Sequence, residues 1–277
     1  MITREILNQA RKTFKEAQNI LITAGAGIGV DSGLPDFRGN EGFWRAYPPI
    51  AKLGISFSAM ANPSWFDRDP GLAWAFYGHR LNLYRNTIPH DGFTRLLEHI
   101  HSNDHRYFIF TSNVDGQFQK AGFEEAFIEE CHGTIHSLQC SIPCSNTIWP
   151  AAGTHIIVDE ERFRVRPPYP ICPQCKAIAR PNILMFGDWG WVADRTSEQD
   201  RQFEHWLTEH FTGQANNVII EIGAGTAVPT VRYLSEDISA KYNVPLIRIN
   251  PRDNMVPPGQ IAIPAGAKAG IDQLLDS

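Results

Sequence analysis

The chain has 277 residues, of which 43% are hydrophobic and 20% charged, and its formal net charge is −5. These values are typical of one large globular domain, or of one domain that carries a smaller module. The slightly acidic balance argues against nucleic-acid binding, which needs a basic surface. No apolar run reaches the ~18 residues of a membrane span, and residues 1–7 lack the apolar core of a signal peptide. We therefore expect a cytoplasmic protein without a membrane or nucleic-acid partner, with a monomer slightly favoured over an oligomer.

Short apolar runs alternate with amphipathic stretches along the chain. Residues 2–18 place their apolar side chains near one face of a helix, and residues 19–23, Asn-Ile-Leu-Ile-Thr, are typical of a buried strand. Further strands are expected at residues 107–111, 217–222 and 245–249, and further helices at residues 93–102 and 198–210. Apolar strands that alternate with helices predict an α/β fold with a Rossmann-like, doubly wound parallel sheet.

Two stretches interrupt this alternation. The first is rich in Trp, Phe, Tyr and Pro and indicates a loop-and-helix insertion, whereas the second holds four cysteines and an extended-looking piece at residues 154–165. We interpret both stretches as parts of a smaller domain that is inserted into the first. The predicted division assigns residues 1–36, 87–139 and 188–277 to the Rossmann-like domain and residues 37–86 and 140–187 to the smaller one.

A glycine-rich turn, residues 25–33 (Gly-Ala-Gly-Ile-Gly-Val-Asp-Ser-Gly), follows the first predicted strand. Glycines in such a turn let backbone N–H groups approach a pyrophosphate closely. The usual dinucleotide fingerprint needs glycine where Val30 stands, so a plain turn between strand and helix is an equal alternative. The other predicted strands also end in small or polar residues, at Asn113, Gly223 and Asn250. Because ligands bind beyond the carboxyl ends of parallel strands, we expect these strand ends to converge on one crevice.

Four of the five cysteines form two close pairs, Cys140 with Cys144 and Cys172 with Cys175. A Cys-x3-Cys pair followed at a distance by a Cys-x2-Cys pair indicates a closed thiolate site for structural zinc. Such a site has no open position for catalysis and should stabilise a small lobe with little core of its own. The alternative is four unrelated thiols, which the prolines in both turns argue against. Cys131 is expected to be a small buried residue.

Residues 33–39, Gly-Leu-Pro-Asp-Phe-Arg-Gly, continue the glycine-rich turn into a string that resembles the nucleotide loop of the sirtuin family. Three more segments resemble sirtuin motifs in the same order. They are residues 111–116 (Thr-Ser-Asn-Val-Asp-Gly), residues 132–134 (His-Gly-Thr), and residues 172–187 with the second cysteine pair, Arg-Pro and Phe-Gly. The chain departs from the family at Ser112 in place of Gln, at Gln117-Phe118 in place of Leu-His, and at Gly223-Ala224-Gly225 in place of Gly-Thr-Ser. These departures bear on individual ribose contacts.

The resemblance implies a bacterial-type, NAD-dependent protein lysine deacylase, with NAD as co-substrate, structural Zn²⁺, and an acylated protein or peptide as partner. In the reaction that it implies, the acyl-lysine carbonyl oxygen attacks C1′ of the nicotinamide ribose and nicotinamide leaves. A ribose hydroxyl, deprotonated with the help of a histidine, then attacks the resulting imidate, so that the acyl group ends on ADP-ribose and free lysine is released.

The resemblance also assigns roles by position. His132 is the expected general base, because a neutral imidazole can accept a proton at cellular pH. Asn113 should order the ribose or a nearby water, and Asp115 should hold the nicotinamide carboxamide. The alternative is that Asn113 and Asp115 are turn residues at strand ends. Phe37 should cover the reactive ring and Arg38 should stabilise phosphate charge, unless Arg38 is a surface charge. The expected NAD-binding residues are Gly25, Ala26, Gly27, Asp36, Phe37, Arg38, Ser112, Asn113, Asp115, Gly223, Ala224 and Asn250.

Tyr77 and Arg80 resemble the Tyr-x-x-Arg pair of sirtuins that accept negatively charged acyl groups. At this spacing both side chains lie on one face of a helix, and a guanidinium can pair bidentately with a carboxylate. The pair favours succinyl or malonyl groups beside acetyl, and the alternative is a packed tyrosine beside an arginine in solvent. Residues 182–187 are expected to form a strand along which an extended peptide can pair, with Met185, Phe186 and Gly187 as substrate contacts.

Two other functions remain open at this point. An NAD glycohydrolase or ADP-ribosyltransferase on the same scaffold would use the same NAD site without a good tunnel for acyl-lysine. A non-catalytic NAD-binding module is the third reading, and the retained His132 argues against it.

Overall fold

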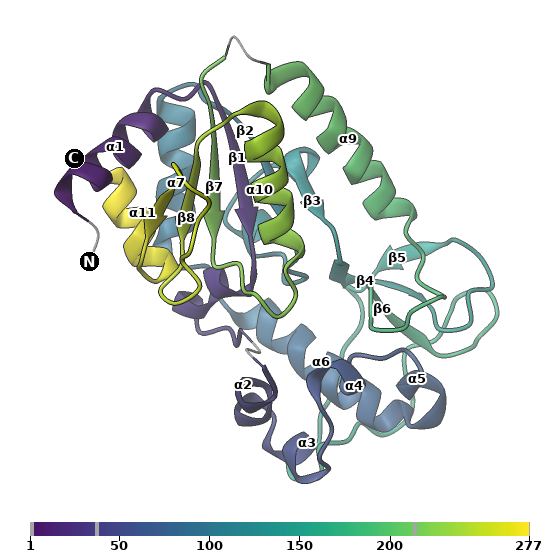
Figure 1. Ribbon diagram of the computed structural model, residues 1–277. Coiled ribbons are helices and arrows are strands. Elements are labelled where there is room, and N and C mark those ends of the chain that lie inside the picture. Colours follow the sequence, from purple (N-terminus) through teal and green to yellow (C-terminus); the bar gives the residue numbers. More distant parts are fainter. Residues whose placement is uncertain (1–2, 37–38, 213–214, 277) are drawn as a thin grey trace.

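The computed structural model describes residues 3–36, 39–212 and 215–276. Its centre is a six-stranded parallel sheet with the order β3-β2-β1-β7-β8-β9 (Figure 1). The strands are β1 (Asn19–Ala24), β2 (Arg106–Thr111), β3 (Ile128–Glu130), β7 (Asn217–Ile222), β8 (Leu246–Ile249) and β9 (Ile261–Ile263). When these strands are numbered within the sheet, the order is 3-2-1-4-5-6, which is the Rossmann arrangement. The predicted parallel, doubly wound sheet is therefore confirmed, and its order reverses between β1 and β7.

Helices cover both faces of this sheet because successive strand residues point to opposite sides. Ile20 and Ile22 pack in a core that includes residues of α1, α7 and α11, whereas Leu21 packs in a core shared with α9 and α10 (Figure 1). The bounds of these helices are α1 (Arg4–Lys15), α7 (Asp91–Ser102), α9 (Asp194–His210), α10 (Thr230–Tyr242) and α11 (Ala267–Leu275). The strands are buried on both faces, which explains their nearly continuous apolar runs.

A smaller antiparallel sheet and a group of helices share a separate core. The sheet has the order β5-β4-β6, with β4 (Gly133–Cys140), β5 (Ile148–Pro150) and β6 (Ala179–Ile183). Aromatic side chains such as Phe43, Trp74 and Phe76 pack with Leu138 of β4 in this core. The helices are α2 (Gly39–Ala46), α3 (Pro48–Lys52), α4 (Phe57–Met60), α5 (Trp65–Arg68) and α6 (Pro70–Asn86). The aromatic insertion is thus largely helical.

Three short helical segments connect the elements near the strand ends. They are η1 (Ala26–Ser32), α8 (Gln117–Lys120) and η2 (Glu125–Phe127). Among the described residues, no helix combines the length and the apolar character that crossing a membrane requires.

The structure differs from the expected elements in two places. The extended-looking piece at residues 154–165 forms no strand and contains only an isolated antiparallel bridge between Asp159 and Arg164. Both residues of this bridge lie within the same loop, which turns back on itself between them. The strand expected at residues 182–187 begins earlier and ends at Ile183. The division of the chain into two domains stays a prediction, and β4 pairs in the smaller sheet although most of its residues were assigned to the Rossmann-like part.

Candidate active site

The carboxyl ends of β1 and β7 are in direct backbone contact. The N–H group of Gly27 donates to the carbonyl oxygen of Gly223 over 3.0 Å. A Cβ atom on Gly27 would lie 2.7 Å from the Cα atom of Gly223, and Gly223 has a φ of +67°. Both glycines are therefore required by this close approach. They join the turn to the loop after β7.

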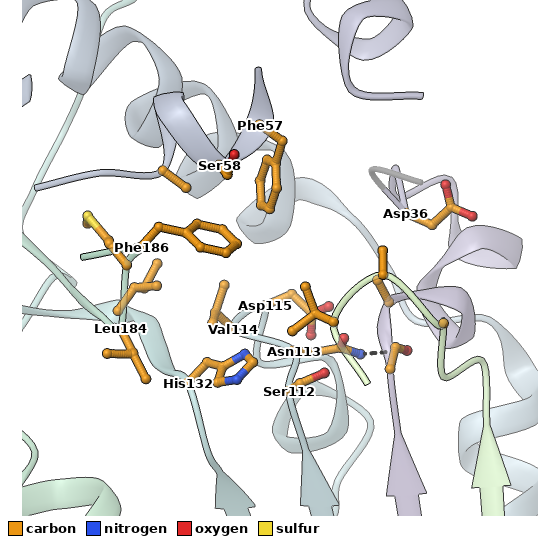
Figure 2. Close-up of a pocket in the computed structure, with 18 of the residues that line it drawn as sticks. Asp36, Phe57, Ser58, Ser112, Asn113, Val114, Asp115, His132, Leu184 and Phe186 are labelled. Carbon is orange, nitrogen blue, oxygen red and sulfur yellow. Dashed lines mark hydrogen bonds between the residues drawn. The ribbon is translucent and has the colours of Figure 1, made fainter. Parts of the chain in front are cut away.

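A cavity of about 940 Å³ opens at these strand ends, where the order of the sheet reverses (Figure 2). The ligand crevice of doubly wound sheets lies at this switch point. Most of the predicted site residues line the cavity, although they come from segments far apart in the sequence. Those that line it are Gly25, Ala26, Asp36, Tyr77, Arg80, Ser112, Asn113, Asp115, His132, Met185, Phe186, Gly187 and Ala224.

The other expected cofactor residues are placed differently. Gly27 and Gly223 lie behind the cavity lining, in the backbone contact between the two strand ends. Asn250 is fully buried, and its Nδ2 donates to the carbonyl oxygen of Ala224 over 2.8 Å. Its Oδ1 accepts from the N–H group of Asp253 over 2.9 Å, so Asn250 shapes the loop that carries Asp253 into the lining. Phe37 and Arg38 lie outside the described residues.

Asn113 joins the end of β2 to the end of β1. Its Nδ2 donates to the carbonyl oxygen of Gly25 over 3.1 Å, a contact drawn in Figure 2. Thr111 supports the same junction, since its Oγ1 donates to the carbonyl oxygen of Ala24 over 2.9 Å. Asn113 is therefore a residue of the strand-end turn and at the same time part of the cavity lining.

His132 lies between β3 and β4, and its ring enters the cavity (Figure 2). The next residue, Gly133, has a φ of +75°, and a Cβ atom there would lie 2.2 Å from the carbonyl oxygen of Asn182. The carbonyl oxygen of His132 also accepts from the N–H group of Leu184 over 2.9 Å. The backbone at His132 is thus held on both sides, and the ring has a defined position.

Burial lowers the pKa of His132, and a hydrogen bond with the backbone of Ser112 opposes this effect. The imidazole is therefore neutral at pH 7, which is the form that accepts a proton. A neutral ring inside the cavity can serve as a general base for a bound hydroxyl group.

Asp115 lies in the cavity near the strand end of β2, in the loop that leads to α8. Its Oδ1 accepts from the N–H group of Gln117 over 3.0 Å, and its carbonyl oxygen is 2.9 Å from Nε2 of His136. Burial raises the pKa of Asp115 to about 6, while the Gln117 hydrogen bond and the charge of Arg80 act in the opposite direction. The hydrogen bond from Gln117 therefore holds the Asp115 carboxyl group at a buried position where its ionisation is less favourable than in water.

We expect Asp115→Asn to stabilise the protein more at pH 8 than at pH 4. Because the pKa of Asp115 is higher in the folded protein than in the unfolded chain, the folded state binds the proton more tightly. The carboxyl group therefore lowers the free energy of unfolding as the pH rises through about 6. The substitution removes this loss, which is on the order of 2–3 kcal/mol. Urea unfolding of both proteins at pH 4 and pH 8 measures the difference in their free energies of unfolding. The same difference at both pH values would contradict the raised pKa of Asp115.

Helix α6 also contributes to the lining of the cavity. Tyr77 and Arg80 line it and are 1% and 7% exposed, so the alternative of an arginine in solvent is wrong. Tyr84, one turn further along α6, accepts from Nε and Nη2 of Arg80 over 3.0 and 2.9 Å. Tyr84 also lines the cavity and was missed, although its i, i+4 spacing from Arg80 was a signal that could have found it.

The departures from the sirtuin motifs fall in two different environments. Ser112, Ala224 and Gly225 line the cavity, so these changes touch the surface that a ligand would meet. Phe118 instead packs in the core beside Phe93, with ring centroids 5.1 Å apart. The change at this position therefore alters core packing outside the cavity lining.

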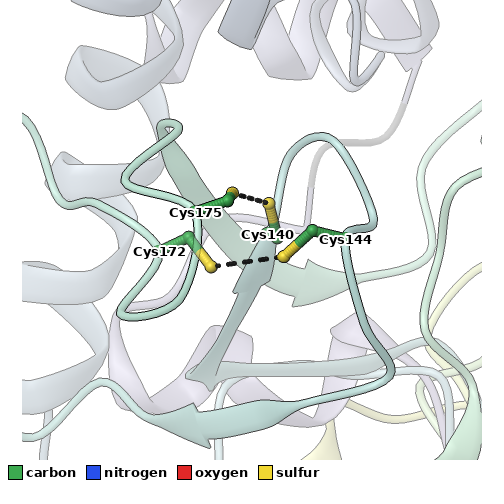
Figure 3. Close-up of side chains that lie close together, drawn as sticks. All are labelled: Cys140, Cys144, Cys172 and Cys175. Atoms are coloured by element: carbon green, nitrogen blue, oxygen red, sulfur yellow. Dashed lines mark hydrogen bonds between the residues drawn. The ribbon is translucent and has the colours of Figure 1, made fainter.

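Cys140, Cys144, Cys172 and Cys175 converge on one point at the edge of the smaller sheet (Figure 3). Their four sulfur atoms lie within 4.8 Å of one another, and the Cys140–Cys175 and Cys144–Cys172 distances are 3.5 and 3.7 Å. A tetrahedral site with Zn–S bonds of about 2.3 Å needs sulfur separations of about 3.8 Å. The four residues therefore fit a structural zinc ion, and the alternative of four unrelated thiols is wrong.

The fold and the cavity together define a class of protein. It has a Rossmann-type fold with a neutral histidine at the switch point, and its smaller lobe carries a thiolate site. The profile of the Sir2 family matches residues 25–220, which is more than half of the chain. The chain belongs to the Sir2 family, and the resemblance seen in its motifs is confirmed.

Relatives of known name are similar to this chain over part of its length. An NAD-dependent protein deacylase of Thermus thermophilus is 32% identical over 66% of this chain and 65% of its own length. The mitochondrial NAD-dependent protein deacylase sirtuin-5 of Danio rerio is 28% identical over 66% of this chain and 61% of its own length. These matches span less than two thirds of either relative. A solved complex of a Sir2 homolog with NAD has a TM-score of 0.73 at 23% identity and covers 97% of this chain and 92% of that chain, which shows a shared fold.

Proposed function

We propose that this Sir2-family chain is an NAD-dependent protein lysine deacylase that forms nicotinamide and O-acyl-ADP-ribose. The observation that carries the proposal is one cavity that is lined both by the strand ends of the parallel sheet and by α6. The glycine-rich turn and Asp115 contribute from the strand ends, and Tyr77 and Arg80 contribute from α6. The ring of His132 enters the same cavity, where two substrates can meet.

The residues present fit NAD at the strand ends. Gly25 and Ala26 bring backbone to the lining where no bulky side chain blocks approach, and Asp115 offers a fixed carboxylate for the nicotinamide carboxamide. NAD supplies the nicotinamide leaving group and the ribose that receives the acyl group. In this assignment His132 accepts the proton of a ribose hydroxyl, and Asn113 orders that ribose or a nearby water.

The other proposed partner is an acylated lysine of a protein or peptide. The segment of residues 184–187 forms one wall of the cavity next to His132 (Figure 2). A distant solved relative is described as a complex with a deacetylated p53 peptide, at 16% identity and a TM-score of 0.62. The cytoplasmic location and the monomeric state stay predictions, and some of the similar proteins are named as mitochondrial.

An NAD assay with and without an acylated peptide separates the three candidate functions. A deacylase releases nicotinamide only when the peptide is present. A glycohydrolase releases it without peptide, and a binding module releases none. The part of the lining that Tyr77 and Arg80 of α6 contribute favours the deacylase, because hydrolysis of NAD alone has no use for it.

The choice of acyl group gives a sharper prediction. If Arg80 binds a carboxylate at the end of the acyl chain, a succinylated peptide should react at least as efficiently as an acetylated one. Arg80→Met should then lower kcat/KM strongly for the succinylated peptide and little for the acetylated one, because acetyl has no carboxylate to lose. A buried charge pair that loses one partner costs about 2–5 kcal/mol.

Steady-state kinetics with the two peptides measure this difference. An equal loss on both would mean that Arg80 has a structural role through Tyr84, to which it donates two hydrogen bonds. Absence of activity on succinyl-lysine in the parent protein would reject the acidic pocket and leave a deacetylase.

A further inference from the structure

Large apolar side chains are exposed at the mouth of the cavity. Within one short segment, Leu184 is 39%, Phe186 43% and Trp189 99% exposed, and all three line the cavity that contains His132. A fully exposed tryptophan contributes none of its large apolar surface to the core, so packing gives no reason for Trp189 at this position. The ring lies on the cavity lining and is open to contact with a partner.

Asp188 holds this segment in a rigid turn. Its side chain is completely buried and binds the equally buried Arg180 through two hydrogen bonds of 2.7 and 2.8 Å. The same carboxylate accepts from the N–H groups of Met185 and Gly190, over 3.3 and 3.1 Å. The residues on both sides of Trp189 are thus fixed to one buried ion pair. Asp188 and Trp189 had no assigned role in the sequence motifs.

The turn points its charge inward and its apolar surface outward. The carboxylate of Asp188 is neutralised by Arg180, so that Leu184, Phe186 and Trp189 define the character of the rim. A rigid aromatic ring contributes contact area without losing much conformational entropy when it binds. Such a rim discriminates between partners mainly by the apolar area that they bury against it.

We propose that the turn of residues 184–190 is a specificity surface for the peptide, with Trp189 contacting a large apolar side chain next to the acylated lysine. The inference rests on the proposed deacylase function and names the substrate class for the same site. The rim is continuous with the cavity of His132, so the chain segments that flank a lysine inserted into that cavity cross Leu184, Phe186 and Trp189.

The test compares two acetylated peptides that differ only at the residues on either side of the acetyl-lysine, with leucine in one and asparagine in the other. The readout is the ratio of their kcat/KM values, in which the fraction of active enzyme cancels. We expect the parent protein to prefer the leucine peptide about tenfold, which corresponds to about 1.4 kcal/mol. Trp189→Ala should bring the ratio close to one, and Trp189→Phe should retain most of the preference.

Ile157→Ala is the matched control, because Ile157 is 87% exposed but does not line the cavity, and its ratio should equal that of the parent. An equal rate on both peptides in the parent, or an unchanged ratio in Trp189→Ala, would overturn the inference while the deacylase function stands. A change of oligomeric state in Trp189→Ala with an unchanged ratio would assign the rim to a second copy of the chain and overturn it as well. If the parent releases no nicotinamide with either peptide, the deacylase function itself fails.

Discussion

His132→Ala is expected to lower kcat by about 10²–10⁴-fold while NAD binding is retained, because removal of a general base has an effect of this size. The ring enters the cavity as a neutral imidazole whose pKa is lowered by burial. Its removal leaves the glycine-rich turn and Asp115 unchanged, since the backbone at this position is held by Gly133 and Leu184. Single-turnover kinetics together with NAD titration by calorimetry separate the loss of turnover from the loss of binding.

His101→Ala is a suitable control, because His101 is an exposed residue at the end of α7. It should keep the kcat of the parent. A folded His132→Ala protein with near-parent activity would remove His132 from the reaction and leave the proposed mechanism without its base.

The second large effect is expected at the thiolate site. Cys172→Ser should abolish zinc binding and destabilise the smaller sheet, because loops of that sheet converge on the four sulfur atoms. The lobe was expected to have little core of its own, but β4 and β6 share a core with the helices of the aromatic insertion, so the loss begins at the thiolate end. Structural zinc in small peptides contributes on the order of 10–16 kcal/mol of apparent binding free energy at pH 7. This contribution is comparable to the ~5–15 kcal/mol by which a typical domain is stable. Elemental analysis should find one zinc per chain in the parent and none in the variant.

Hydrogen exchange locates the unfolding. Amides of β4 and β6 should lose protection in Cys172→Ser before those of β1 and β7, which lie in the core of the parallel sheet. Cys131→Ala is the matched control, since Cys131 lies apart from the four ligands and should keep the zinc. Its side chain is half-buried at the edge of the core shared with α9 and α10, and not fully buried as the sequence led us to expect, because it follows the last residue of an edge strand. A zinc-free parent protein, or a variant that retains its zinc, would contradict the thiolate site.

The parallel sheet was predictable because its central strands are buried on both faces and read as apolar runs. Ile20, Leu21 and Ile22 illustrate this, since they alternate between two cores and are all fully buried. The edge strands β3 and β9 have three residues each, too few to show a period in the sequence. The smaller sheet was less visible because β4 contains polar residues and a register shift between Thr134 and Leu138.

Site residues that belong to a sequence motif were predictable. Residues whose place depends on a tertiary contact were less predictable. The turn, Asn113, Asp115 and His132 were found from their motifs and line one cavity. Gly27 and Asn250 have the right residue type in the right segment, but their positions are decided by tertiary packing, which places them behind the lining.

Of the cavity residues that had no predicted role, Tyr84 and Trp189 were missed for different reasons. Tyr84 had a spacing signal on α6 that was overlooked, because the Tyr-x-x-Arg pair alone drew attention to that helix. Trp189 had no signal in the sequence, since a tryptophan usually indicates core. Its exposure follows from the buried pair of Asp188 and Arg180, which only the folded chain brings together.

The measurement that tests the central claim most directly is the product balance of one reaction with NAD and an acetyl-lysine peptide, followed by mass spectrometry. The proposed function predicts one nicotinamide and one O-acetyl-ADP-ribose for each acetyl group removed, with no nicotinamide released when the peptide is omitted. Release of nicotinamide and free ADP-ribose at the same rate without peptide would contradict it and identify the protein as an NAD glycohydrolase.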